Sequence, residues 1–293
     1  MSPHPTCSVI VPTYRRPQAL RRCVEAIAGQ AYPATRLELV VADDGEDDGL
    51  PDLLAPFRGR VELTLVRSGR RGPAAARNAA AAVAGGELLA FTDDDCEPDP
   101  GWLAALASPR DGSPVAVGGR TLNGLPRNPR SRFSQLVISA GYAHNNVDPD
   151  DARFLTSNNI AVTRDAYTAV GGFDERFRTS EDRDLCDRLV LAAGCLAYDE
   201  RAVVWHYHEM TLRDFWQQQH EYGRGARAYH VAYAARHGMR IPIRPSFYIG
   251  VAGRAWRTRT SWADGLHAAA LFGVWGAATA VGYARGPLAA TAS

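Results

Sequence analysis

The stretch Leu88-Leu89-Ala90-Phe91-Thr92-Asp93-Asp94-Asp95 joins four apolar or small residues to three consecutive carboxylates. A short apolar run is typical of a buried strand, and the carboxyl end of a strand is where open α/β sheets bind ligands. Three adjacent carboxylates repel one another unless a cation neutralises them. Mg²⁺ and similar hard cations take carboxylates together with substrate phosphates as ligands. The stretch therefore indicates a metal–diphosphate site, with a solvated acidic turn as the alternative.

The chain before this stretch alternates apolar runs with helical patterns. Alternation of this kind predicts a parallel sheet with helices on both faces, and right-handed crossovers bring the strand ends to one edge. At that edge we expect residues 12–14, 43–44, Arg67 and 93–95 to gather. Strands are expected at 7–11, 37–41, 61–66 and 88–91, and helices at 17–29, 49–57 and 73–84.

Composition excludes several classes of protein. The formal net charge is +1 with basic and acidic residues mixed, which argues against a nucleic-acid-binding face. The five cysteines form no CxxC pair, so we expect a reducing compartment without disulfides or a zinc site. No signal peptide is expected at the N-terminus, and we expect a cytoplasmic protein. Neither a Gly-x-Gly-x-x-Gly nor a P-loop motif is present, so we expect carboxylates and metal, rather than a glycine loop, to hold a nucleotide.

Several short motifs occur in a fixed order along residues 6–208. They are Ser8-Val9-Ile10-Val11-Pro12-Thr13-Tyr14, Val40-Val41-Ala42-Asp43-Asp44-Gly45, the Asp triplet, Ser157-Asn158-Asn159-Ile160-Ala161, Gly171-Gly172-Phe173-Asp174-Glu175-Arg176-Phe177 and Glu181-Asp182-Arg183-Asp184-Leu185. In this order they resemble the motifs of the family 2 glycosyltransferases, which are inverting enzymes with the GT-A fold. The resemblance implies a catalytic domain at 1–208, with a nucleotide-sugar-binding half at 1–120 and an acceptor-binding half at 121–208. A helical extension at 209–293 would follow.

The same resemblance implies roles on the donor side. Asp44 would hydrogen-bond the donor base, although Asp43-Asp44-Gly45 is also a typical turn. Arg77 would approach the nucleotide, where its planar fork suits phosphate. The nucleotide-binding residues would be Pro12, Thr13, Tyr14, Asp43, Asp44, Arg77, Asp93 and Asp94.

A divalent metal, Mg²⁺ or Mn²⁺, would neutralise the leaving diphosphate. The resemblance assigns Asp95 and Asp93 as its ligands. His206 and His208 follow an apolar run, and some members of the family use a histidine here as a further ligand. We select His208 for this role, with a structural histidine as the alternative.

Asp182 is the expected general base. Inversion needs direct attack by an acceptor hydroxyl, and a carboxylate must take its proton. Glu181-Asp182 begins an expected helix, whose N-terminus favours an ionised carboxylate. Glu181 is the second choice, and a simple helix cap is the alternative. Asn158 and Asn159 are expected at the acceptor boundary.

Two segments of the second half lie outside these motifs, and several roles are compatible with each. Residues 121–153 are too long for a plain loop and suggest an acceptor-side lid. After a helix expected at 212–237, the apolar stretch 266–284 is close to the length that spans a membrane, but it is rich in Ala and Gly. It is compatible with peripheral attachment to the inner face of the cell membrane, with a homodimer interface, or with packing on the catalytic domain.

These patterns predict a metal-dependent glycosyltransferase with a UDP-sugar donor, or a dTDP-sugar as second choice. The acceptor would be a carbohydrate, a lipid-linked glycan or a small molecule. A nucleotidyltransferase and a non-catalytic carbohydrate-binding protein are the alternatives, and nucleic acid is not an expected partner.

Overall fold

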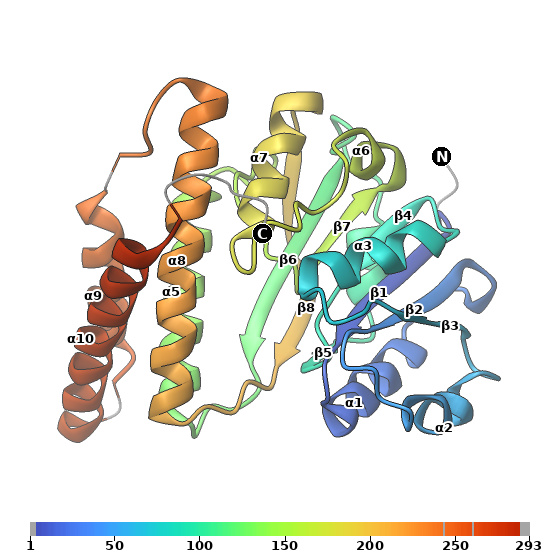
Figure 1. Ribbon diagram of the computed structural model, residues 1–293, viewed down its shortest axis with the longest axis horizontal. Helices are drawn as coiled ribbons and strands as arrows, with labels where there is room; N and C mark the ends of the chain where they lie inside the picture. The colour runs from blue at the N-terminus through green and yellow to red at the C-terminus, as the bar shows by residue number, and fades with distance from the viewer. Residues whose placement is uncertain (1–3, 243, 260, 288–293) are drawn as a thin grey trace.

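The computed structural model describes residues 4–242, 244–259 and 261–287. Within these residues one sheet of eight strands carries the fold (Figure 1). The strands are β1 (Cys7–Thr13), β2 (Leu37–Asp43), β3 (Glu62–Arg67), β4 (Leu88–Phe91), β5 (Cys96–Pro98), β6 (Ala116–Asn123), β7 (Ile160–Thr163) and β8 (Leu196–His206). The helices are α1 (Pro17–Ala28), α2 (Leu50–Leu54), α3 (Pro73–Val83), α4 (Trp102–Leu106), α5 (Pro129–Asn145), α6 (Arg164–Ala169), α7 (Glu181–Ala193), α8 (Leu212–His237), α9 (Pro245–Arg257) and α10 (Trp262–Arg285), with 3-10 turns at Ala34–Arg36 and Ala55–Phe57.

The sheet order is β3-β2-β1-β4-β7-β6-β8-β5. Strands β1 to β4 pair in parallel, as does β6 with β8. Strand β7 runs antiparallel to both of its neighbours, and β5 runs antiparallel to β8. The predicted parallel sheet is therefore confirmed for the first four strands, and the second half adds antiparallel strands that extend it.

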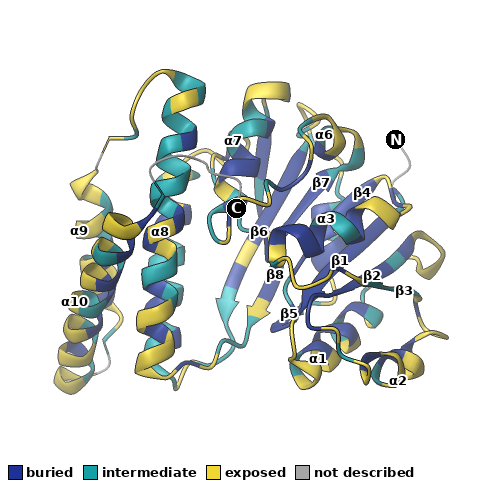
Figure 2. Cartoon of the chain, viewed as in Figure 1, coloured by how far each residue is buried: buried dark blue, intermediate teal, exposed yellow. Residues whose placement is uncertain are grey.

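Alternating side chains of the strands feed two cores on opposite faces of the sheet. In β1, Val9 and Val11 join the core that includes α1, α2 and α4, whereas Ile10 joins the core that includes α3, α6 and α7. This alternation follows from the two-residue period of a strand. Because both faces are covered, β1, β2 and β4 are almost wholly buried, whereas the edge strand β3 is partly exposed (Figure 2).

A third core joins the C-terminal helices to helix α5. Its largest members are Phe133 of α5, Phe215 of α8 and Trp275 of α10. Helix α5 lies in the segment 121–153, so that segment holds a packed helix of 17 residues rather than a long loop. The predicted C-terminal helical extension is confirmed over its described residues; residues 1–3 and 288–293 of the predicted domains lie outside them.

The backbone of α8 lies very close to that of α10 and to the loop before α7. A Cβ on Gly282 of α10 would lie 1.9 Å from the carbonyl oxygen of His220, and one on Gly225 would lie 2.0 Å from the hydroxyl of Thr179. Thr179 in turn donates to the carbonyl of Glu221 (2.9 Å). Helix α8 is therefore held directly beside the loop that enters α7.

Candidate active site

The carboxyl ends of β1, β2 and β4 meet at one edge, as predicted. Thr13 pairs with Asp43 in register, and Asp43 with Arg67. The Thr13 hydroxyl donates to Asp94 Oδ2 (2.7 Å), which ties the end of β1 to the acidic triplet after β4. Of the residues predicted to gather here, Arg67 turns outward to an exposed ion pair with Asp48.

Asp43 and Asp44 use their carboxylates to shape the surrounding loops. Asp43 is buried and accepts the backbone N–H groups of Gly45 and Asp47 (both 2.8 Å). Asp44 accepts from the backbone of Arg71 and Gly72 (both 2.9 Å). These hydrogen bonds occupy part of the acceptor capacity of each carboxylate, and the contact of Asp43 and Asp44 with a donor base stays a prediction.

Pro12 and Tyr14 lie on either side of Thr13. Pro12 is buried, whereas the Tyr14 ring is half exposed and stacks with the Arg15 guanidinium. Arg15 has a left-handed backbone (φ 52°), a conformation that costs free energy in a residue other than glycine. The exposed Tyr14 ring therefore lies at the carboxyl end of β1, where a nucleotide base could stack on it.

The three acids after β4 differ in their surroundings. Asp94 is fully buried and pairs with Arg16 (2.5 Å), and burial raises its pKa to about 6. Asp95 is buried too, but its hydrogen bond with His206 and the charges of His206 and Arg16 outweigh that burial and hold its pKa well below the usual range. Asp93 is more open and pairs with Arg77 (2.6 Å).

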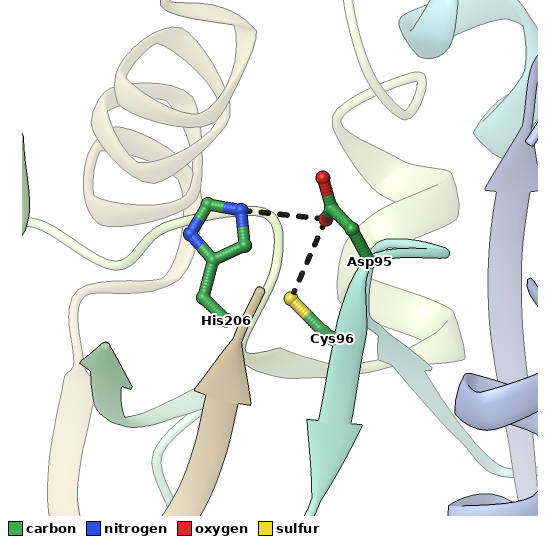
Figure 3. Close-up of side chains that lie close together, drawn as sticks. All are labelled: Asp95, Cys96 and His206. Atoms are coloured by element: carbon green, nitrogen blue, oxygen red, sulfur yellow. Dashed lines mark hydrogen bonds and ion pairs between the residues drawn. The ribbon is translucent and has the colours of Figure 1, made fainter. Parts of the chain in front are cut away.

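Asp95, Cys96 and His206 bring three potential metal-binding atoms within 4.8 Å of one another (Figure 3). His206 Nε2 lies 3.3 Å from Asp95 Oδ1. Burial raises the pKa of the Cys96 thiol, so the thiol is protonated at neutral pH and is a poor ligand. Carboxylate and imidazole are both ordinary ligands of Mn²⁺, so this donor set fits a divalent cation.

His208, the histidine predicted as a ligand, is not in that cluster. Its ring centroid lies 5.1 Å from that of His206, and its Nδ1 meets the amide of Gln218 (3.3 Å). Burial, and then the neighbouring His206, lower its pKa to about 4, which leaves a neutral imidazole beside the cluster. The alternation of His206 and His208 at the end of β8 gave no signal for choosing between them.

Arg77 connects the acidic triplet to α7. It is buried, and its two terminal nitrogens pair separately with Asp93 and with Glu181 (3.0 Å). Ser157 also donates to Glu181 (3.3 Å). Burial, and then the adjacent Asp182, raise the pKa of Glu181 to about 7 even though Arg77 opposes this.

Asp182 is the freer of the two candidate bases. Its carboxylate accepts backbone N–H groups, that of Arg183 at 2.8 Å and that of Ser157, and has no arginine partner like that of Glu181; the residue is partly exposed. Burial raises its pKa, which brings a carboxylate closer to the range of an effective base. Ser180, just before α7, has a left-handed backbone (φ 69°), and such conformations often occur at functional sites.

The two residues predicted at the acceptor boundary, Asn158 and Asn159, differ in position. Asn158 is buried next to the site and accepts from Thr156 (2.7 Å) and Thr121. Asn159 is fully buried, where it accepts from Trp102 (2.8 Å) and donates to the carbonyl of Ala202 (3.0 Å). Asn159 therefore serves the packing of the sheet and does not reach the site.

One face of α8 covers the site, a feature that the sequence did not reveal. Gln218 meets His208, Gly225 meets Thr179, and Tyr222 lies between them on the same face at helical spacing. The Tyr222 side chain is nevertheless 41% exposed. Burial, and then the carboxylates of Asp182 and Glu181, raise its pKa. Tyr222 therefore lies close enough to Asp182 and Glu181 to interact with their charges.

A doubly covered α/β sheet with acids, arginine and a metal-competent cluster at its strand ends is the arrangement of the GT-A class of glycosyltransferases. The sequence profile described as "Glycosyl transferase family 2" matches residues 8–171. The chain belongs to glycosyl transferase family 2.

Known proteins agree with this assignment. The pre-mycofactocin glycosyltransferase of Mycobacterium tuberculosis is 32% identical over 76% of this chain, which spans about half of that relative (47%). A mannosyltransferase, PcManGT of Pyrobaculum calidifontis, solved with GDP-Man and Mn²⁺, has a TM-score of 0.64 at 24% identity, covering 97% of this chain and 77% of that one. TarS 1–349 of S. aureus, solved with UDP-GlcNAc, has a TM-score of 0.59 at 17% identity, covering 94% and 81%. At these identities the two structures establish the fold.

Proposed function

We propose that this protein is an inverting, metal-dependent glycosyltransferase in which Asp182 is the general base. The observation that carries the proposal is the pairing of one partly exposed carboxylate, Asp182, with a second, Glu181, that is already neutralised by Arg77. Glu181 is thereby committed to the structure, and Asp182 is left to accept the proton of an attacking hydroxyl. Removing a general base typically lowers a rate by 10²–10⁴.

The donor side lies within 1–120. A nucleotide-sugar would place its diphosphate at the acidic triplet, where a divalent cation held by Asp95 and His206, with Asp93 beside them, would neutralise the leaving group. Mn²⁺ could use both the carboxylates and the imidazole, whereas Mg²⁺, which prefers oxygen ligands, would use the carboxylates. Tyr14 would stack on the base. We keep a UDP-sugar as the first choice and a dTDP-sugar as the second; the solved relatives include one complex with GDP-Man and one with UDP-GlcNAc.

We place the acceptor beside Asp182 at the start of α7. Asp182 and Asn158 would contact it from 121–208, and the half-exposed Tyr222 would contact it from the helical extension, 209–293. A tyrosine offers an apolar ring face and a hydroxyl donor, the combination that suits a sugar or another polyhydroxylated acceptor.

The proposal is tested by following UDP release from α-linked UDP-sugars with Mn²⁺ and by determining the product anomer by NMR. We expect a β-anomer as the first product. Asp182→Asn should lower the rate at least 100-fold and keep UDP affinity within threefold, and Asp165→Asn, an exposed carboxylate on α6, is the control. If Asp182→Asn transferred sugar at the wild-type rate, Asp182 would not be the general base. Release of the sugar 1-phosphate in place of UDP would instead identify a nucleotidyltransferase.

We also propose a peripheral membrane location for the C-terminal helices. Among the described residues, Trp262–Arg285 is the one helix long and apolar enough to cross a membrane, by length and composition. Exposed Trp256, Trp262 and Leu266 lie near exposed Arg257, a mixture that suits an anionic bilayer surface. Vesicles with anionic lipid should sediment the protein, and Trp262→Ser with Leu266→Ser should abolish this; equal binding to zwitterionic vesicles would contradict it.

A further inference from the structure

Both carboxylate oxygens of Asp95 are already engaged by side chains. Arg16 Nη1 donates to Oδ2 (2.6 Å), and His206 lies 3.3 Å from Oδ1 (Figure 3). The other terminal nitrogen of Arg16 pairs with Asp94. A cation that binds Asp95 must therefore displace a partner from one of its oxygens or share that oxygen with it.

Arg16 is the partner that can leave. Its side chain is 49% exposed, whereas the His206 side chain is 16% exposed at the end of β8. Arg16 also lies outside the sheet, in the turn between β1 and α1, directly after the left-handed Arg15. Moving the Arg16 side chain into solvent breaks two ion pairs and disturbs no packed core.

The Arg16 guanidinium replaces part of the charge that a cation would bring. Asp93, Asp94 and Asp95 are adjacent, and ionised carboxylates at such spacing repel one another. Arg16 contacts two of the three, and Arg77 contacts the third. A planar guanidinium also pairs well with phosphate oxygens.

We propose that Arg16 is an exchangeable counter-cation that couples metal binding to nucleotide binding. Without metal it neutralises Asp94 and Asp95. When a divalent cation takes Asp95, Arg16 is released toward the diphosphate of the donor. This inference rests on the proposed function, because it requires the metal and the diphosphate to share this site.

The inference predicts two opposite effects of removing Arg16. Mn²⁺ alone should bind Arg16→Gln more tightly than the wild type, because the competing cation is gone. UDP should tighten Mn²⁺ binding in the wild type by about 5–150-fold, the usual range of coupling between sites. The factor should be smaller in Arg16→Gln, where only the direct attraction between metal and diphosphate remains. A purely structural arginine would produce neither pattern.

The experiment is a Mn²⁺ titration followed by electron paramagnetic resonance, with and without UDP. Arg22→Gln is the matched control, because Arg22 is an exposed arginine on α1 whose partner, Glu97, lies beyond the triplet (3.1 Å). Arg16→Lys is a second variant that keeps the charge and loses the fork; it should bind Mn²⁺ alone as weakly as the wild type and show reduced coupling.

Identical Mn²⁺ affinities of Arg16→Gln and Arg22→Gln, both with and without UDP, would overturn the inference. Asp95→Ala separates this from failure of the site itself. If Asp95→Ala loses Mn²⁺ while the two arginine variants behave alike, Arg16 has no such role and the metal site stands. If Asp95→Ala binds Mn²⁺ as the wild type does, Asp95 is not a metal ligand. The proposed role of Arg16 is then wrong as well, because it depends on metal binding at Asp95.

Discussion

Arg77→Met should destabilise the protein strongly, because Arg77 neutralises Glu181 inside the structure. The arginine and the glutamate are both buried, and Arg77 also pairs with Asp93 and lies over the Phe173 ring at 5.4 Å. Removing one partner of a buried pair costs about 3–5 kcal/mol. At roughly 2–4 °C per kcal/mol for domains of this size, Tm should fall by about 10 °C.

The control is Arg71→Met, which breaks a second arginine–glutamate pair on the surface. The Arg71 side chain is 63% exposed and pairs with Glu175. An exposed pair contributes about 0–1 kcal/mol, so the Tm of Arg71→Met should stay within about 3 °C of the wild type. The assay is thermal unfolding followed by circular dichroism at pH 8, where the Arg77–Glu181 ion pair of the wild type is formed.

Two further measurements sharpen this prediction. The loss of stability in Arg77→Met should shrink at pH 5, because Glu181 then takes a proton and no buried charge is left. Adding Glu181→Gln to Arg77→Met should recover part of the stability for the same reason. A Tm for Arg77→Met at pH 8 equal to that of Arg71→Met would refute the reasoning.

Three other predictions follow from the site and the helices. Because the pKa of folded Glu181 is raised from 4.5 to about 7, its contribution to stability is complete below pH 4.5 and is lost as pH rises through 7, a change of about 3 kcal/mol; urea unfolding of Glu181→Gln should lack it. Gly282→Ala places a Cβ against the His220 carbonyl and should cost about 1–3 kcal/mol, whereas Gly276→Ala on the same helix meets nothing within 4 Å and should stabilise by about 0.5–1 kcal/mol. Tyr222→Ala should leave the affinity for UDP with Mn²⁺ within twofold and raise the KM for an acceptor; an unchanged KM would exclude Tyr222 from the acceptor site.

The first half of the fold was predictable because local patterns determine it. The apolar runs at 7–11, 37–41 and 88–91 lie within or match β1, β2 and β4, and Pro17 begins α1 as its position predicted. The antiparallel placement of β7 between β4 and β6 was not predictable. Pairing between distant strands depends on the packing of the whole sheet, which a short run of residues does not encode.

The candidate site was predictable in its members and not in their contacts. Asp95 and Asp182 stand out in the chain as motifs. Arg16 and Tyr222 do not, because an arginine in a turn and a tyrosine on a helix are ordinary until the fold brings them to the carboxylates. The choice of His208 over His206 illustrates the same limit, since only the register of β5 with β8, where Cys96 pairs with His206, places one histidine at Asp95.

The most direct test of the account is calorimetric titration of the full chain with UDP, dTDP, GDP and CDP, each with Mn²⁺ and with EDTA. The account predicts that UDP binds with Mn²⁺, that EDTA abolishes binding, and that Asp95→Ala loses the metal dependence. Binding of none of the four nucleotides, or UDP binding that neither EDTA nor Asp95→Ala weakens, would contradict it.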